Sequence, residues 1–461
     1  MIETIETTLN SLVGLVWSWP VVILCLGAGF FITVLTGGIQ FRAFMHAIAV
    51  VRGKFDKEGE HGEISHMQAL SAAVSATVGL GNIAGVAIAV KTGGPGAVFW
   101  MWMIGLVGMA TKFAECGLGT IYRVQDEQGN FRGGAMYYIT RGIPERFPGL
   151  SGVVGPLAMF FAFACAVASL GGGNMFQSNN VASLLNASFG VPPVVTGVLL
   201  AGAVGAVILG GIKRIGQVAG ILVPAMCGIY ILGALGICLM NFGDVGPAIA
   251  LIFTDAFSGQ AAAGGALGAV IITGVRRAVF SSEAGLGSAP IAHAAARTDE
   301  PLRQGIVALL EPFIDTIVVC TATALVIVMA GMYGAGAPDL DGAALTAAAF
   351  DHFVPGFGNG FLAFAVCLFA FSTAISWCYY GETSTQYMFG SKAVLPFKVL
   401  FVAAVFVGAV WKLGPVIAFS DLTLGLMVVP NLLAVLLLSG KLREETTSYF
   451  GKLKSGAFDT K

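Results

Sequence analysis

Two glycines in the middle of a long apolar segment are the first residues whose types and spacing suggest a chemistry. Gly79 and Gly81 interrupt the run 67–90, and a glycine costs roughly 1 kcal/mol relative to alanine inside a helix. Within a membrane, unwound backbone is tolerated only where protein buries it or where it lines a cavity. A helix broken there leaves free N–H groups, which suit a carboxylate, and free C=O groups, which suit a cation. With side-chain oxygens from Thr77 and Asn82, the stretch predicts a site for a small zwitterion and a cation. The alternative is that the glycines only allow close helix packing.

The same pattern occurs a second time in the chain. The stretch Ser75-x-x-Val-Gly-Leu-Gly-Asn82 returns as Ser281-x-x-Ala-Gly-Leu-Gly-Ser288. An odd number of predicted spans separates the two segments, so the second unit is inverted in the membrane. Glycine-interrupted segments at matching positions of two halves are the best sequence indication of a transporter binding site. The repeat therefore predicts two inverted units of five helices each.

The composition is that of a polytopic all-α membrane protein. Of the 461 residues, 56% are hydrophobic and 11% are charged, whereas a soluble protein has about 25% charged residues. The chain therefore has the lipid bilayer as a partner. Its apolar runs, each long enough for ~30 Å of hydrocarbon, predict about eleven spans: 13–37, 67–90, 95–121, 152–185, 193–211, 217–240, 263–296, 304–332, 360–388, 394–411 and 415–438.

The distribution of Lys and Arg predicts the orientation. Most of the 24 basic residues lie in the loops after the first, third, fifth and seventh spans or in the tail, and cytoplasmic loops are the basic ones. We expect a multi-pass protein of the cell (inner) membrane with its N-terminus outside and its C-terminus in the cytoplasm. The predicted division is an extra helix and loop (1–66), a first five-helix repeat (67–241), a second inverted repeat (242–438) and a cytoplasmic tail (439–461).

Longer motifs carry a resemblance to a known family. The first break resembles that of sodium-coupled transporters with the LeuT fold, in the amino acid–polyamine–organocation superfamily. Residues 93–102 (GGPGAVFWMW) and 280–293 (FSSEAGLGSAPIAH) resemble the signatures of the alanine/glycine:cation symporter family, with Gly105 as a small departure. The resemblance implies import of alanine or glycine with sodium as the coupling ion, without an organic cofactor, enzymatic activity or a nucleic-acid partner. A proton-coupled carrier for similar amino acids, or a passive channel, are the alternatives.

The resemblance also implies the site residues. The amides of Leu80 and Gly81 would face the substrate carboxylate. One sodium site would use the carbonyls of Ser75 and Val78 with the hydroxyls of Ser372 and Thr373, and a second would use Thr77 and Asn82. The expected substrate-binding residues are Thr77, Gly79, Leu80, Gly81, Asn82, Gln177, Phe280, Ser281, Thr373 and Trp377.

Polar and aromatic residues in other spans complete the prediction. Asn174 and Gln177 share a helix face, and Gln177 is favoured as a ligand over a role in joining helices. Phe280, Phe371 and Trp377 are candidates for the wall of an alanine-sized pocket, because a ring blocks every larger side chain, whereas fit alone discriminates weakly.

Charged residues at membrane depth predict support and gating. Glu115 is expected to brace the second break, and Glu283 lies in that break, where it would accept backbone hydrogen bonds or take a proton. Arg277, or failing that Arg276, is expected to meet Asp421 as an outer gate, because an isolated charge at that depth is costly. The alternative places both arginines in the cytoplasm, with the break near Thr273-Gly274.

Overall fold

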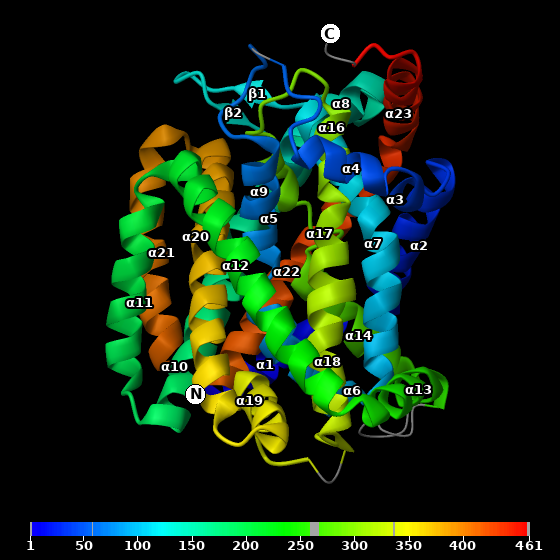
Figure 1. Cartoon of the computed structure of the whole chain (residues 1–461). Coiled ribbons are helices and arrows are strands. Elements are labelled where there is room, and N and C mark those ends of the chain that lie inside the picture. The colour runs from blue at the N-terminus through cyan, green and yellow to red at the C-terminus, as the bar shows by residue number, and fades with distance from the viewer. Residues whose placement is uncertain (1, 58, 259–266, 335–336, 459–461) are drawn as a thin grey trace.

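The computed structural model describes residues 2–57, 59–258, 267–334 and 337–458. In these ranges seven helices are long and apolar enough to cross a membrane, and two bent helix pairs raise the number to nine (Figure 1). The two remaining predicted spans correspond to the shorter apolar helix α11 (Pro193–Ile208) and to the interrupted pair α14 (Leu267–Ser282) and α15 (Ala289–His293). The predicted start of the seventh span at residue 263 lies outside the described residues. The predicted all-α polytopic architecture is confirmed.

The first predicted unit begins with a broken helix. Helix α5 starts with a capping box, in which the Ser65 hydroxyl accepts from the Gln68 amide and the Gln68 side chain accepts from the Ser65 amide. Beyond the break the chain bends by 47°. The helical elements of this unit are α5 (His66–Thr77), η1 (Gly81–Gly85), α6 (Val86–Gly93), α7 (Gly96–Ile121), α8 (Ala135–Arg146), η2 (Pro148–Leu150), α9 (Ser151–Leu170), η3 (Gly171–Met175), α10 (Phe176–Phe189), α11 and α12 (Gly211–Met240).

The second predicted unit also contains a broken helix, and its glycines explain the break. Gly285 and Gly287 have φ of 95° and 75°, a left-handed conformation that glycine adopts without a steric cost. Glu283, with φ of 55°, is the one non-glycine residue with a positive φ in the described part of the chain. The helical elements of this unit are α13 (Phe242–Ser258), α14, α15, α16 (Leu302–Ala308), α17 (Leu310–Pro312), η4 (Phe313–Cys320), α18 (Thr321–Met329), α19 (Gly342–Phe353), η6 (Gly358–Leu362), α20 (Ala363–Phe389), η7 (Ser391–Ala393), α21 (Val394–Val410) and α22 (Leu413–Leu437).

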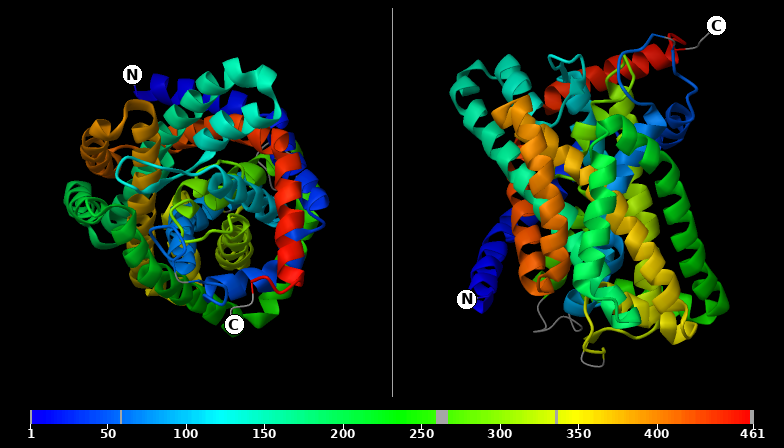
Figure 2. Two further views of the ribbon diagram at one scale, coloured as in Figure 1. Left: turned by 90° about the horizontal axis from the view of Figure 1, so that it is seen from above. Right: turned by 90° about the vertical axis from the view of Figure 1, so that its left-hand side faces the viewer.

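The first predicted span, 13–37, is wrong as a single helix. The chain forms α1 (Ile2–Val16) and α2 (Trp19–Leu35), which are bent by 45°. Pro20 lies in the first turn of α2, where it fits a helix start but cannot continue a preceding helix. Helix α1 lies at an angle outside the main bundle in the right-hand view of Figure 2, and it packs along α22.

Short elements at the two ends of the bundle were not predicted from the sequence. One end carries α3 (Ile39–Arg42), α4 (Phe44–Val51), α8, the tail helix α23 (Ser439–Lys454) and a hairpin of β1 (Val124–Gln125) and β2 (Phe131–Arg132); we call this end the α23 face (Figure 1). The other end carries α13 and α19, and we call it the α19 face. Helix α1 begins toward the α19 face, so the first and last helices lie at opposite ends of the molecule (Figures 1 and 2).

Candidate functional site

The first break is held by side chains from its own segment and from α10. The Gly79 amide donates to Asn82 Oδ1 at 2.9 Å, and the Leu80 amide donates to Gln177 Oε1 at 3.0 Å. Gln177 in turn donates to the carbonyl of Gly172 at 2.8 Å. A Cβ on residue 79 would lie 2.3 Å from the Thr373 hydroxyl oxygen, so glycine is required for the close approach of α20 to the break.

Ser75 and Thr373, two of the four residues of the first predicted sodium site, meet where α5 ends beside α20. The Ser75 hydroxyl donates to the carbonyl of Ser372 at 2.7 Å, and the Thr373 hydroxyl donates to the carbonyl of Ser75 at 2.9 Å. Val78 follows the last residue of α5 and is buried. Neutral oxygens from the first break and from α20 therefore share one buried position, as a cation with oxygen ligands needs.

At the second predicted cation position the structure adds a residue that sequence reasoning missed. Asp315, in η4, is fully buried and accepts from Asn82 Nδ2 at 2.6 Å. Its carboxylate also accepts from the Ser281 hydroxyl at 3.0 Å and from the Thr316 hydroxyl at 2.7 Å. No ion pair joins Asp315 to a basic side chain within the described ranges. An acid at membrane depth is a functional candidate by default, and that rule was sufficient to find Asp315 in its apolar segment.

Three predicted residues direct their side chains to partners other than the predicted cation or substrate. The hydroxyl of Thr77 donates to the carbonyl of Val74 at 3.2 Å, and the hydroxyl of Ser372 donates to the carbonyl of Phe369 at 2.9 Å, each inside its own helix. Asn174 donates to the carbonyl of Phe401 at 2.7 Å, so it joins α21 to η3, whereas Gln177 reaches the break.

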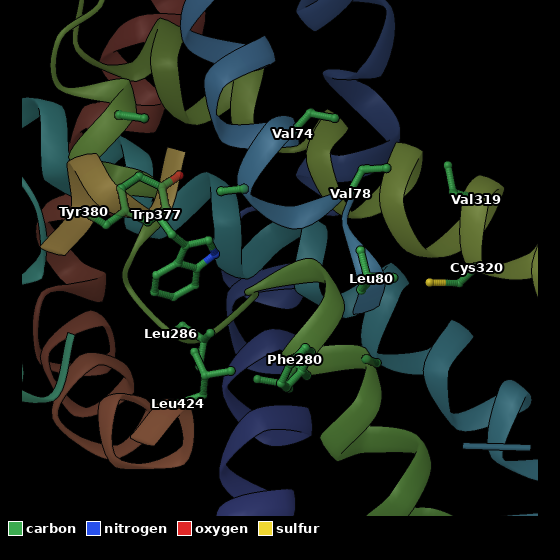
Figure 3. Close-up of a cluster of buried hydrophobic side chains, with 14 of the residues drawn as sticks. Val74, Val78, Leu80, Phe280, Leu286, Val319, Cys320, Trp377, Tyr380 and Leu424 are labelled. Atoms are coloured by element: carbon green, nitrogen blue, oxygen red, sulfur yellow. The ribbon is translucent and has the colours of Figure 1, made fainter. Parts of the chain in front are cut away.

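Large side chains from α14, α20 and the first break belong to one buried hydrophobic cluster (Figure 3). Phe280 and Trp377 are both buried, and Phe371 is half-buried. The Phe280 ring meets the Phe176 ring edge-on, with 5.0 Å between centroids. A Cβ on residue 173 would lie 2.2 Å from the Trp377 ring, so the glycine there makes room for the indole.

The second break is braced through an asparagine that was not predicted. Asn431, on α22, donates both to the Glu115 carboxylate and to the carbonyl of Gly285, the latter at 2.8 Å. The Gly285 amide also faces Glu115. Glu283 accepts from the Ser288 hydroxyl across the break. Glu115 thus lies where bracing was expected, with Asn431 between it and the Gly285 carbonyl.

Arginines on the α19 side of the second break meet an aspartate on α22. Arg277 donates to the Asp421 carboxylate, and Arg276 Nε lies 3.8 Å from the other carboxylate oxygen. Arg277 and Asp421 are both buried. The Trp17 indole donates to the Asp421 carbonyl at 2.8 Å, and the Arg277 guanidinium lies 5.0 Å from the centroid of the Phe280 ring.

Comparisons with known proteins identify the family and the fold of the chain. A profile described as the sodium:alanine symporter family matches residues 2–461. The chain is 45% identical over 441 residues to the sodium/alanine symporter AgcS of Methanococcus maripaludis, covering 95% of this chain and 96% of that protein. It is 37% identical over 456 residues to the amino-acid carrier protein AlsT of Bacillus subtilis, covering 98% and 94%. Among solved structures, MhsT in complex with L-phenylalanine matches with a TM-score of 0.53 and 16% identity over 82% of this chain and 99% of that one, which shows a shared LeuT-type fold.

Proposed function

Since the chain belongs to the sodium:alanine symporter family, we propose that it imports alanine or glycine together with sodium by alternating access. It is a multi-pass membrane protein and a cation-coupled amino-acid symporter, not an enzyme. The observation that carries the sodium proposal is the meeting of Ser75 and Thr373. Neutral oxygens from a broken helix and from α20 form a buried position that suits a cation with oxygen ligands.

The substrate carboxylate would bind at the amides of the first break, where Gln177 now accepts from Leu80. A substrate carboxylate that binds the Leu80 amide requires Gln177 to move away or to share that N–H group. The position of Gln177 therefore depends on whether substrate is bound. Phe280 and Trp377 limit the substrate's side chain, which favours alanine and glycine over leucine.

Asp315 would supply the charge of a second cation position beside Asn82 and Ser281. A buried carboxylate is costly without a positive partner, and sodium would meet that need. The same observation favours the alternative of proton coupling, because a proton on Asp315 would also neutralise it.

Alternating access needs one closure on each side of the site. On the α19 face, which we place outside, Arg277 and Asp421 close the path. On the α23 face, which we place in the cytoplasm, backbone pairing joins the segments beside the two broken helices: the Glu63 amide donates to the Ala295 carbonyl at 2.8 Å and the Arg297 amide to the Ile64 carbonyl at 2.8 Å. The Arg123 guanidinium adds bonds to the carbonyls of residues 294, 296 and 298. We call this set the inner clasp.

Uptake of radiolabelled alanine into proteoliposomes tests the proposal, with the sodium and pH gradients varied independently. We expect uptake to require the sodium gradient and to persist without a pH gradient. Uptake that follows the pH gradient in the absence of sodium establishes the proton alternative. Exchange of internal for external labelled alanine (counterflow) distinguishes the carrier from a channel, which shows none.

A further inference from the structure

A second buried cluster of ionisable side chains lies between the transport site and the α23 face. His293, the last residue of α15, contacts Gln304 on α16 and Glu311 on α17. Gln304 also contacts His66 at the start of α5, and Glu311 pairs with Lys112 on α7 at 3.0 Å. All five side chains are buried, and none belongs to the substrate or sodium positions proposed above.

With the Gln304 amide oriented as it is, the contacts of His293 hold one proton more than a neutral imidazole beside a carboxylate. Gln304 directs its Nε2 to His66 Nδ1 and its Oε1 to His293 Nδ1, the latter at 2.7 Å. His293 Nε2 lies 2.6 Å from Glu311 Oε1. An amide oxygen and a carboxylate only accept, so with the Gln304 amide in this orientation either both ring nitrogens are protonated or Glu311 carries the second proton, whereas the opposite orientation suits a neutral His293. Either protonated form contains one bound proton, and the Lys112 ammonium beside the other Glu311 oxygen favours the imidazolium.

The contacts fit a proton better than a metal ion. Ligand atoms of Cys116, His293 and Glu311 lie within 4.8 Å of one another. However, a metal with nitrogen and oxygen ligands at about 2.0–2.2 Å holds those ligands well apart, whereas His293 and Glu311 touch at 2.6 Å. Lys112 also places a positive charge 3.0 Å from the other oxygen of Glu311, which disfavours a second cation there.

The cluster joins parts that must separate when the α23 face opens. Helices α5 and α15 are the halves of the two broken helices on that side of the breaks, and Gln304 connects them through His66 and His293. Loss of the proton leaves the acceptor Gln304 Oε1 or the Glu311 carboxylate facing an unprotonated ring nitrogen. Repulsion between two acceptors is then relieved only if Gln304 turns over or the helices move apart.

We propose that His293 and Glu311 form a proton-binding site whose bound proton helps to hold the inner clasp closed, so that cytoplasmic acidity slows substrate release. This inference rests on the proposed function for its orientation and its transport cycle. The other titratable groups around the pair are Lys112, Glu115 and Cys116 on α7, Glu283 in the second break, His66 on α5 and Tyr380 on α20.

Sodium-driven alanine uptake into proteoliposomes tests the site when only the internal pH is varied, between about 6 and 8. Below the midpoint we expect wild-type uptake to fall by up to about tenfold per pH unit, as the titration of a single proton requires. The variant His293→Gln should lose this dependence, while His352→Gln, an exposed histidine on α19, should keep it. A flat wild-type profile, or an unchanged profile in His293→Gln, overturns the proposal.

Two further measurements test the proton site if the variant His293→Gln fails to fold or if the transport proposal itself fails. Gln304→Glu keeps the shape of the side chain and adds a negative charge beside His293, so the midpoint should rise by about one pH unit or more; an unmoved midpoint counts against the site. If wild-type protein takes up no alanine, the proposed function fails. The proton site is then read from 15N spectra of histidine-labelled protein, where a buried histidine with both ring nitrogens protonated at neutral pH is expected and only neutral imidazoles refute it.

Discussion

The variant Asp421→Asn should open the α19 side of the transport path. It leaves the buried Arg277 guanidinium without its anionic partner, and Arg277 and Asp421 are only 1% and 3% exposed. Removing one member of a buried ion pair costs about 3–5 kcal/mol. That cost falls on the closed state, because water can solvate the arginine once the path opens. Arg276, at 3.8 Å and 24% exposed, adds little by comparison.

A shift of about 3–5 kcal/mol changes the ratio of closed to open molecules by roughly two to three and a half powers of ten. The assay is the labelling rate of a single cysteine at Leu424, one turn along α22 from Asp421, by an impermeant thiol reagent in a background without the native cysteines. We expect faster labelling in Asp421→Asn and slower net uptake of alanine, with substrate binding from outside retained. The control is Asp244→Asn, an exposed acid in the first turn of α13 with the same change of charge. Equal labelling rates in the two folded variants would refute the gate.

Three further predictions concern the site itself. Thr373→Ala and Asn82→Ala each remove a neutral oxygen from a proposed sodium position, so half-maximal uptake should need roughly fivefold more sodium, for about 1 kcal/mol per lost contact; unchanged sodium curves contradict the assignment. Asp315→Asn removes the carboxylate charge from the second position and should raise the sodium concentration needed by about 10- to 100-fold, measured as sodium-dependent binding of labelled alanine. An unchanged sodium requirement would mean that no cation binds beside Asp315. Trimming Phe280 or Trp377 to leucine should let valine and leucine compete with alanine uptake, and an unchanged list of competitors argues against the wall.

The two breaks could be predicted from the sequence because a break depends on local chemistry. Gly79 removes a Cβ atom where α20 approaches, Gly81 removes one where α14 approaches, and Gly285 and Gly287 adopt left-handed backbone. The positions of Arg277 and Asp421 followed from their depth along two spans. Their charges make isolation costly at that depth, and the structure places them in contact.

Contacts that depend on how helices are rotated about their axes were not predicted. Asn431 reaches Glu115 from α22, and Asp315 reaches Asn82 from η4, although the members of each pair are far apart in the sequence. Hydrophobic periodicity is weak in a helix that is apolar all round, so it does not show which face carries a lone polar residue. The bend at Pro20 was missed for another reason: the apolar run continues through it, and length alone suggested one span.

The Phe280 ring has the Arg277 guanidinium 5.0 Å from its centroid and lies in the buried cluster that we propose as the wall of the substrate site (Figure 3). A bulky amino acid that pushes the ring aside also moves the surface on which the cation rests, and a cation over an aromatic face is stabilised by about 0.5–2 kcal/mol. We therefore expect the protein to discriminate between amino acids when the Arg277–Asp421 gate closes as much as when they bind. Amino acids slightly larger than alanine should occupy the site and leave again by the same side, acting as blockers of transport and not as cargo.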